Sequence, residues 1–134
     1  MERPPLSVTS VTIGTDRPHT LAAFYAHLLG WRVTVDDPPD PDHPELGGWA
    51  QIAPPEGETG PTLNFEYERH FTRPVWPAQA GHPFASQHLD IHVTDLAAAQ
   101  EWAVACGAQL AGVQPQADVR VMIDPSGHPF CLFT

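Results

Sequence analysis

The chain repeats one pattern of secondary structure twice, and this repeat limits its possible folds more than any other feature. In each half, an apolar strand pattern precedes a helical pattern that ends at a glycine, Gly30 in the first half and Gly107 in the second. These glycines lie 77 residues apart, and Val11 matches Leu89 at an offset of 78. Each half therefore predicts a β-α-β-β-β unit, which cannot bury its sheet alone. The expected fold class is α+β: two tandem βαβββ modules form a curved mixed or antiparallel sheet around a central pocket, with the helices outside.

Hydrophobic periodicity predicts the elements of each half. In the first helix, apolar residues recur at i, i+3, i+4, i+7 and i+8 from Leu21, which places them on one stripe. Asp16 is positioned to cap this helix, and Pro18 suits its first turn. We expect one domain over residues 1–134, with module 1 at about 6–68, a linker at 69–84 and module 2 at about 85–134. The expected strands cover 6–15, 31–35, 49–53 and 62–68, then one that ends at 95, then 109–113, 119–123 and 128–133.

Residues 87–95 alternate between polar and apolar side chains before a helix-start signal. His88, Asp90 and His92 are predicted to point to one side of a strand, and the alternate apolar residues to the other. The apolar side can pack under a helix that Thr94 or Asp95 caps. Two histidines and an aspartate are unusual side chains to direct at a protein interior, so the polar side is expected to face a ligand pocket.

Composition excludes several classes of function. The net charge is −10, and an acidic chain repels nucleic acid and anionic membranes, so neither is expected as a partner. The chain has no lysine, which excludes a protein-derived Schiff base and a P-loop lysine. Two cysteines, Cys106 and Cys131, are too few for a disulfide framework. No apolar run approaches the roughly 20 residues of a membrane span, and no signal peptide is recognisable, so a cytoplasmic location is expected.

Residues 36–47 combine five acidic residues with four prolines in twelve positions, a composition that cannot pair in a sheet. The main interpretation is a solvated loop, because blocks of like charge stay exposed. A lid over a pocket is the alternative.

The chain resembles the vicinal oxygen chelate superfamily, which includes glyoxalase I, bleomycin-resistance proteins and extradiol dioxygenases. It is most similar to the small bacterial glyoxalase-like domain proteins. The motifs that carry the resemblance cover nearly the whole chain. They are Leu21-Ala22-Ala23-Phe24-Tyr25, Leu28-Leu29-Gly30-Trp31, His88-Leu89-Asp90-Ile91-His92-Val93-Thr94-Asp95, Gly107-Ala108 and Asp124-Pro125-Ser126-Gly127-His128-Pro129-Phe130-Cys131-Leu132.

The resemblance implies metal-ligand positions on the first and last strand of both modules. Carried over, these positions hold Ser10, Glu66, His88 and Cys131. Glu66 and His88 suit a divalent ion such as Zn²⁺, Ni²⁺, Mn²⁺ or Fe²⁺, whereas Ser10 replaces the usual histidine and Cys131 the usual glutamate. A catalytic metal site normally needs three good protein ligands, so a metal-free pocket is the main interpretation and no cofactor is assigned.

The resemblance implies a homodimeric protein that binds a small molecule in the hollow between its modules, without a tightly bound catalytic metal. The alternative is a metal-dependent lyase, isomerase or dioxygenase that uses Glu66 and His88 as its catalytic candidates. Whether the chain is an enzyme stays open at this point. The expected pocket residues are Ser10, Trp49, Glu66, His88, Asp90, His92 and Cys131.

Overall fold

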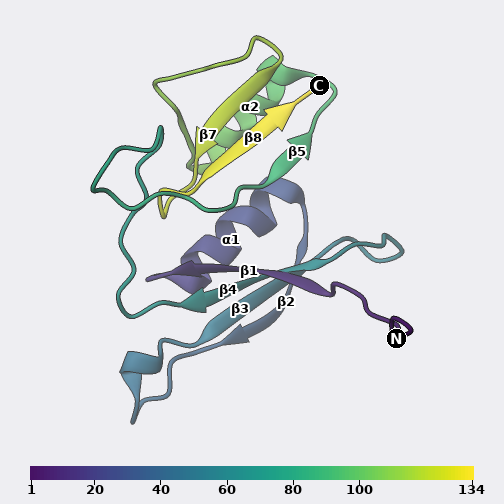
Figure 1. The fold of residues 1–134 in the computed structure, drawn as a ribbon, viewed down its shortest axis with the longest axis vertical. Helices are drawn as coiled ribbons and strands as arrows, with labels where there is room; N and C mark the ends of the chain where they lie inside the picture. The colour runs from purple at the N-terminus through teal and green to yellow at the C-terminus, as the bar shows by residue number, and fades with distance from the viewer. The chain divides into compact units, whose positions relative to one another are not determined.

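A computed structural model describes residues 1–134, which form two compact units, Met1–Arg69 and His70–Thr134. Each unit holds one four-stranded mixed sheet and one α-helix (Figure 1). In each sheet the outer first strand runs parallel to the last strand, and the other neighbours are antiparallel. The predicted α+β class and the β-α-β-β-β repeat are therefore confirmed.

Unit 1 has the strand order β1-β4-β3-β2. Its third strand has the predicted bounds, and its fourth ends one residue earlier than expected. The first strand is shorter than predicted, because residues 6–9 have no regular structure. The elements are β1 (Ser10–Thr15), α1 (Pro18–Leu29), β2 (Arg32–Asp37), a 3-10 turn η1 (Pro44–Leu46), β3 (Trp49–Ala53) and β4 (Thr62–Tyr67).

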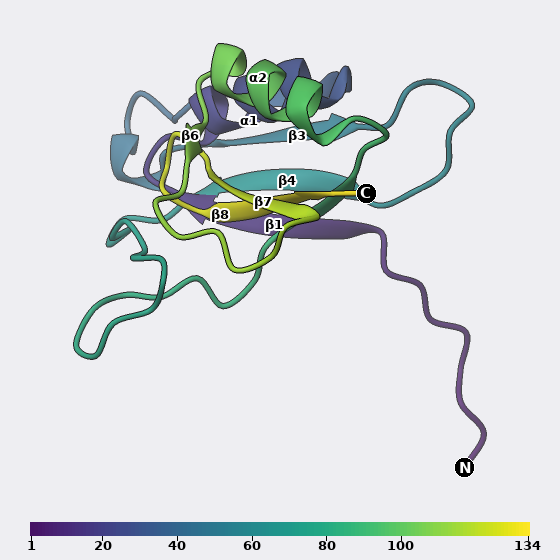
Figure 2. The ribbon, with the colours of Figure 1, turned by 90° about the horizontal axis from the view of Figure 1, so that it is seen from above.

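The core of unit 1 lies between α1 and one face of its sheet. Leu63 and Phe65 alternate with polar residues along β4 and are buried, and Leu21 and Tyr25 of α1 are also buried. The Tyr25 ring stacks on Phe65 with 5.7 Å between ring centroids. Each such side chain contributes about 1.5–3 kcal/mol by leaving water. Because side chains alternate along a strand, the polar residues of β3 and β4 lie on the sheet face that α1 leaves uncovered (Figure 2).

The start of α1 differs from the prediction. Its N-cap position is Arg17, and no side chain there accepts a hydrogen bond from the first turn, so Asp16 is not the cap. Instead, Pro18 opens the helix, and a proline needs no partner for a backbone N–H that it lacks. The helix ends as predicted at Gly30, whose φ of 67° is left-handed.

Unit 2 has the equivalent strand order β5-β8-β7-β6. Its helix is capped as predicted, because the Asp95 carboxylate accepts a 3.0 Å hydrogen bond from the Ala98 N–H, and it ends at Gly107. Thr94 does not take this role. The elements are β5 (Asp90–His92), α2 (Leu96–Cys106), β6 (Gln109–Leu110), β7 (Val119–Ile123) and β8 (Pro129–Phe133).

Strand β6 is shorter than the predicted 109–113, and a glutamine side chain explains why. Ala111 N–H still donates to the Val121 carbonyl at 3.0 Å. The Gln114 amide then accepts from Val121 N–H and donates to the Val121 carbonyl, both at 2.9 Å. The side chain thus occupies the backbone groups of β7 that a longer β6 would use.

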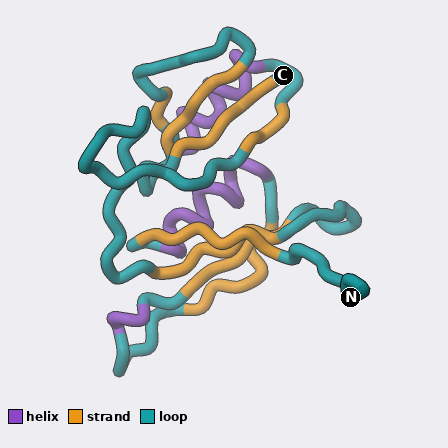
Figure 3. Tube along the Cα trace, in the orientation of Figure 1, coloured by secondary structure: helices purple, strands orange, loops and turns teal.

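The long segment between β4 and β5 has no helix or strand, as its composition predicted (Figure 3). Neither α-helix of the chain has the length and apolar character that crossing a membrane requires.

Candidate functional site

A pocket of about 700 Å³ lies in unit 1, over the polar face of the sheet. We name it the unit 1 pocket. Its floor comes from β3 and β4, and its wall comes from the last residue of β2 and the proline-rich segment that follows. The lining residues are Asp37, Pro38, Pro39, Asp40, Pro41, Leu46, Gly48, Trp49, Asn64, Glu66 and Tyr67.

The acidic segment 36–47, interpreted mainly as a solvated loop, therefore has a second role. Most of its residues are exposed, as predicted, but five consecutive residues from Asp37 to Pro41 form the pocket wall. Asp36 and Asp37 are the end of β2 and pair with Ala50 and Trp49, contrary to the expectation that segment 36–47 does not pair in a sheet. The prolines suit the part of the wall after β2, because a fixed φ limits the freedom of a segment.

Two successive glycines hold this wall against the sheet. Gly47 and Gly48 have left-handed φ values of 64° and 66°. A Cβ on Gly47 would overlap the Tyr67 ring, and a Cβ on Gly48 would overlap the backbone carbonyl oxygen of Asp37. Only glycine allows both this conformation and this close approach. The Gly47-Gly48 pair is the feature of the sequence that could have indicated a close approach of the wall to the sheet, and the predictions made from the sequence did not include it.

The chemistry of the unit 1 pocket is acidic and aromatic. Asp37, Asp40 and Glu66 contribute carboxylates, and Trp49 and Tyr67 contribute rings. The lining contains no arginine or histidine, and neither Asp37 nor Glu66 belongs to a salt bridge. A concave surface lined by charges of one sign concentrates ions of the opposite sign. The pocket is therefore suited to a cationic molecule with an apolar, planar part.

The structure places Glu66 and Trp49 together but keeps Ser10 apart from them. Trp49 and Glu66 are paired across β3 and β4, and both line the pocket. Ser10 pairs with Thr62, four residues before Glu66 on β4. At about 3.3 Å per residue, Ser10 and Glu66 lie about 13 Å apart along the strand. Within unit 1 these two predicted residues therefore do not converge on one ion.

The Ser10 hydroxyl is also engaged elsewhere, because its Oγ lies 2.7 Å from the Thr62 Oγ1 in a hydrogen bond. A neutral hydroxyl bound in this way is a poor metal ligand. The donor set that the family resemblance implies for module 1 therefore does not fit a divalent ion.

Three predicted pocket residues meet in unit 2. The ligand atoms of His88, Asp90 and Cys131 all lie within 4.8 Å of one another. We name them the unit 2 donor cluster. His88 Nε2 lies 3.2 Å from Asp90 Oδ1, and Asp90 pairs with Cys131 across β5 and β8. His88 and Asp90 are therefore in direct contact.

His92 lies farther along the same strand and has a different partner. It pairs with Phe133, and the two rings meet edge to face with 5.5 Å between centroids. The predicted common face of the strand is consistent with this placement, because Asp90 and His92 pair with alternate residues of β8.

The environment of Cys131 raises the pKa of its thiol. Burial contributes most, the Asp90 charge adds to it, and a hydrogen bond from the thiol to Asp90 adds further. All three disfavour the thiolate, because it is a charged group beside another anion and partly out of water.

Alkylation should report this effect in Cys106→Ser protein, where Cys131 is the remaining thiol. In chelator-treated samples, we expect its iodoacetamide reaction rate to rise at a pH above the ordinary thiol pKa of 9.0. Asp90→Asn should move that rise to lower pH but not fully to 9.0, because burial, the largest cause, persists. An identical pH–rate profile with and without Asp90 would contradict this assignment.

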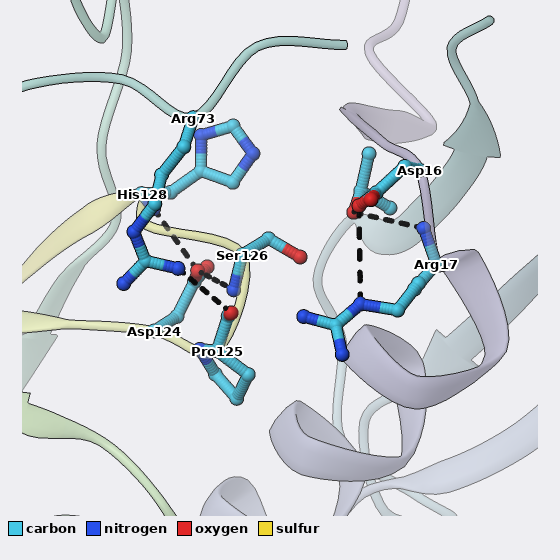
Figure 4. A network of polar contacts seen from close by, with 8 residues as sticks. Asp16, Arg17, Arg73, Asp124, Pro125, Ser126 and His128 are labelled. Atoms are coloured by element: carbon cyan, nitrogen blue, oxygen red, sulfur yellow. Dashed lines mark hydrogen bonds and ion pairs between the residues drawn. The ribbon is translucent and has the colours of Figure 1, made fainter.

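The turn after β7 has a structural role. Asp124 is 1% exposed, and its Oδ1 accepts hydrogen bonds from the N–H groups of Ser126 and His128 at 2.9 and 3.0 Å (Figure 4). Arg73 from the linker donates to the Pro125 carbonyl at 3.0 Å. These bonds close the predicted turn and do not identify a nucleophile.

The two units have the same strand order and the same parallel pairing of their first and last strands, so corresponding positions can be identified. Thr12 pairs with Asn64 in unit 1, and Asp90 pairs with Cys131 in unit 2. With the offset of 78 between the halves, Asn64 is therefore the counterpart of Cys131. Glu66 lies two residues farther along β4 than this counterpart position.

Comparisons with known proteins agree with this architecture. The family model described as "Glyoxalase-like domain" matches residues 10–133. The chain belongs to this glyoxalase-like family, within the vicinal oxygen chelate superfamily. No curated protein sequence matches it.

Several solved structures share the fold. TnmS3, an antibiotic binding protein from Streptomyces sp. CB03234, is 18% identical with a TM-score of 0.57, and the match covers 98% of each chain. A glyoxalase family protein from Enterococcus faecalis is 18% identical with a TM-score of 0.66, over 96% of this chain and 97% of that one. A glyoxalase/bleomycin resistance protein/dioxygenase family enzyme from Burkholderia phytofirmans PsJN is 15% identical with a TM-score of 0.63, over 92% and 94%.

Proposed function

We propose that the protein binds a small organic cation with a planar aromatic part in the unit 1 pocket, and that it does so without chemical turnover. The observation that carries this proposal is the lining: three carboxylates and two aromatic rings, with no cationic side chain. The volume of about 700 Å³ lies within the range of roughly 300–1,000 Å³ that small-molecule sites occupy.

Two interactions support a cationic ligand. The Glu66 carboxylate lies beside Trp49 across the strand pair, so a positive charge near Glu66 also approaches an indole ring. A cation over an aromatic face gains about 0.5–2 kcal/mol, more as water is excluded. The net charge of −10 adds long-range attraction. The name of TnmS3 as an antibiotic binding protein supports the same general kind of function.

The expected homodimer and the cytoplasmic location stay part of this proposal. The metal-dependent lyase, isomerase or dioxygenase that would use Glu66 and His88 stays the alternative. The two functions differ in one observable, because a binding protein returns its ligand chemically unchanged.

Isothermal titration with N-methylquinolinium and its neutral relative quinoline tests the proposal. We expect the cation to bind at least about tenfold more tightly, a difference of about 1.4 kcal/mol. Glu66→Gln should remove most of this preference, and Trp49→Ala should weaken the binding of the cation about tenfold. Glu58→Gln is the matched control, because it removes one negative charge from an exposed turn outside the pocket.

Equal affinity for the two compounds, or equal losses in Glu66→Gln and Glu58→Gln, would contradict the proposal. The compound recovered after long incubation is analysed by mass spectrometry. A converted compound would favour the enzymatic alternative.

A further inference from the structure

We propose that Asn64 determines the specificity of the unit 1 pocket, because its side-chain amide selects ligands that carry a neutral carbonyl oxygen besides their positive charge. This inference rests on the proposed function and narrows the ligand class to an aromatic cation with a carbonyl substituent. Asn64 lines the pocket and is the only asparagine of the chain.

A series of hydrogen bonds between neutral side chains crosses all four strands of the unit 1 sheet. Thr34 Oγ1 of β2 donates to Gln51 Oε1 of β3 at 3.0 Å, and Gln51 Nε2 donates to Asn64 Oδ1 of β4 at 2.8 Å. Thr62 Oγ1 donates to the same Asn64 oxygen at 3.4 Å and lies 2.7 Å from Ser10 Oγ of β1. Two neighbouring side chains therefore hold the Asn64 amide in one orientation.

The direction of these hydrogen bonds decides which part of the Asn64 amide is open to the pocket. Its Oδ1 accepts both bonds, whereas its Nδ2 has no acceptor in the protein. This nitrogen is not enclosed by protein either. Because an amide nitrogen carries two hydrogens and does not accept, Asn64 offers the pocket hydrogen-bond donors only. A ligand without an acceptor would leave these donors unsatisfied, so the site favours a ligand that has one.

The acceptor on the ligand is expected to be uncharged, because the rest of the pocket is acidic. Asp37, Asp40 and Glu66 line the same pocket and would repel a carboxylate or a phosphate on the ligand. A ketone, ester or amide carbonyl accepts a hydrogen bond without bringing a negative charge. The combination of acidic side chains with one oriented amide therefore favours a carbonyl oxygen.

Strand pairing sets the spacing between the two groups that the pocket recognises. Trp49 pairs with Glu66, and Gln51 pairs with Asn64, so the aromatic and acidic pair lies next to the amide pair on one sheet face. Glu66 follows Asn64 by two residues on β4, which corresponds to about 7 Å along the strand. A bicyclic aromatic cation spans this distance when its carbonyl group is on the ring remote from the charged nitrogen.

Two probes that differ in one group test the inference by isothermal titration of the full chain. 6-Acetyl-N-methylquinolinium and 6-isopropenyl-N-methylquinolinium share charge, ring system and shape, but only the acetyl compound has a carbonyl oxygen. We expect the acetyl compound to bind about fivefold more tightly, as one added hydrogen bond provides. Asn64→Asp keeps the oxygen that Gln51 binds and replaces the NH₂ group by a second acceptor. This variant should still bind both cations but should lose the preference.

NMR of the unaltered protein gives a second readout that does not depend on a variant. Because the chain has one asparagine, selective isotope labelling of asparagine yields the signals of a single side-chain NH₂ group. These signals should shift more with the acetyl compound than with the isopropenyl compound. Equal shifts would show that the carbonyl oxygen does not meet the Asn64 amide and would overturn the inference.

Gln116→Glu is the matched control, because it makes the same change from amide to carboxylate at an exposed residue of unit 2. It should keep the fivefold preference. Glu66→Gln should weaken the binding of both compounds and leave their ratio unchanged. Equal affinities of the two cations for the unaltered protein, or a preference retained in Asn64→Asp, would overturn this inference and leave the proposed function standing. Failure of both cations to bind would overturn the proposed function and this inference together.

Discussion

Replacing Gly48 with alanine is expected to lower the free energy of unfolding by about 3 kcal/mol and to abolish ligand binding in the unit 1 pocket. Two costs combine at this position. The left-handed φ of 66° is unfavourable for alanine, and the new Cβ would overlap the carbonyl oxygen of Asp37. That oxygen belongs to the backbone, so the overlap can be relieved only by moving the pocket wall. Urea unfolding and titration with N-methylquinolinium measure the two effects.

Gly57→Ala is the control, because it shares the first cost and lacks the second. Gly57 has a φ of 89°, and a Cβ added there would meet no atom within 4 Å beyond its chain neighbours. We expect a loss of about 1–2 kcal/mol and unchanged ligand binding. Equal effects of the two substitutions on both measurements would show that contact between Gly48 and the segment 37–39 does not hold the wall.

Asp124→Ala is expected to destabilise unit 2 by about 3 kcal/mol. The buried carboxylate accepts two backbone hydrogen bonds that close the turn between β7 and β8, and its removal leaves the N–H groups of Ser126 and His128 without this acceptor. Native-state hydrogen exchange should show protection in β7 and β8 reduced by about 100-fold. Asp124→Asn keeps an oxygen acceptor and should cost about 1 kcal/mol.

Asp95→Ala provides a comparison at a helix cap. Its carboxylate accepts one exposed hydrogen bond from Ala98, so its loss should cost only about 1 kcal/mol. A larger loss in Asp95→Ala than in Asp124→Ala would contradict the role assigned to the buried turn.

Local patterns in the sequence predicted most of the fold. The alternation in 49–53 and 119–123 matched two strands to the residue, and Gly30, Gly107 and Asp95 marked helix ends correctly. These features depend on nearby residues, because backbone conformation and capping are decided within a few positions. The exceptions also had local causes, such as Pro18 opening α1 without the Asp16 cap.

The candidate site was harder to predict because it depends on strand register. Ser10 and Thr62 are 52 residues apart in the chain, and only their pairing shows that Glu66 lies about 13 Å from Ser10. The same register brings Asp90 beside Cys131. Periodicity identifies the face on which a side chain lies, but not its partner on the next strand.

The wall of the unit 1 pocket is a second feature that could not be predicted from the sequence. The charges and prolines of 36–47 predicted exposure, which is correct for most of its residues. The position of this segment over Trp49 depends instead on close approach at Gly48, a contact between non-adjacent parts of the backbone. A glycine pair after a proline-rich segment is consistent with such an approach, but it does not specify the partner.

Locating a bound cation by NMR tests the central claim most directly. Labelled protein is titrated with N-methylquinolinium, and the backbone amide shifts are followed at each residue. We predict saturable shifts centred on Asp37, Gly48, Trp49, Glu66 and Tyr67, which line the pocket. These shifts should be absent in Gly48→Ala and present in Gly57→Ala. Shifts centred on unit 2, or none at saturating concentration, would contradict the assignment of the unit 1 pocket as the binding site.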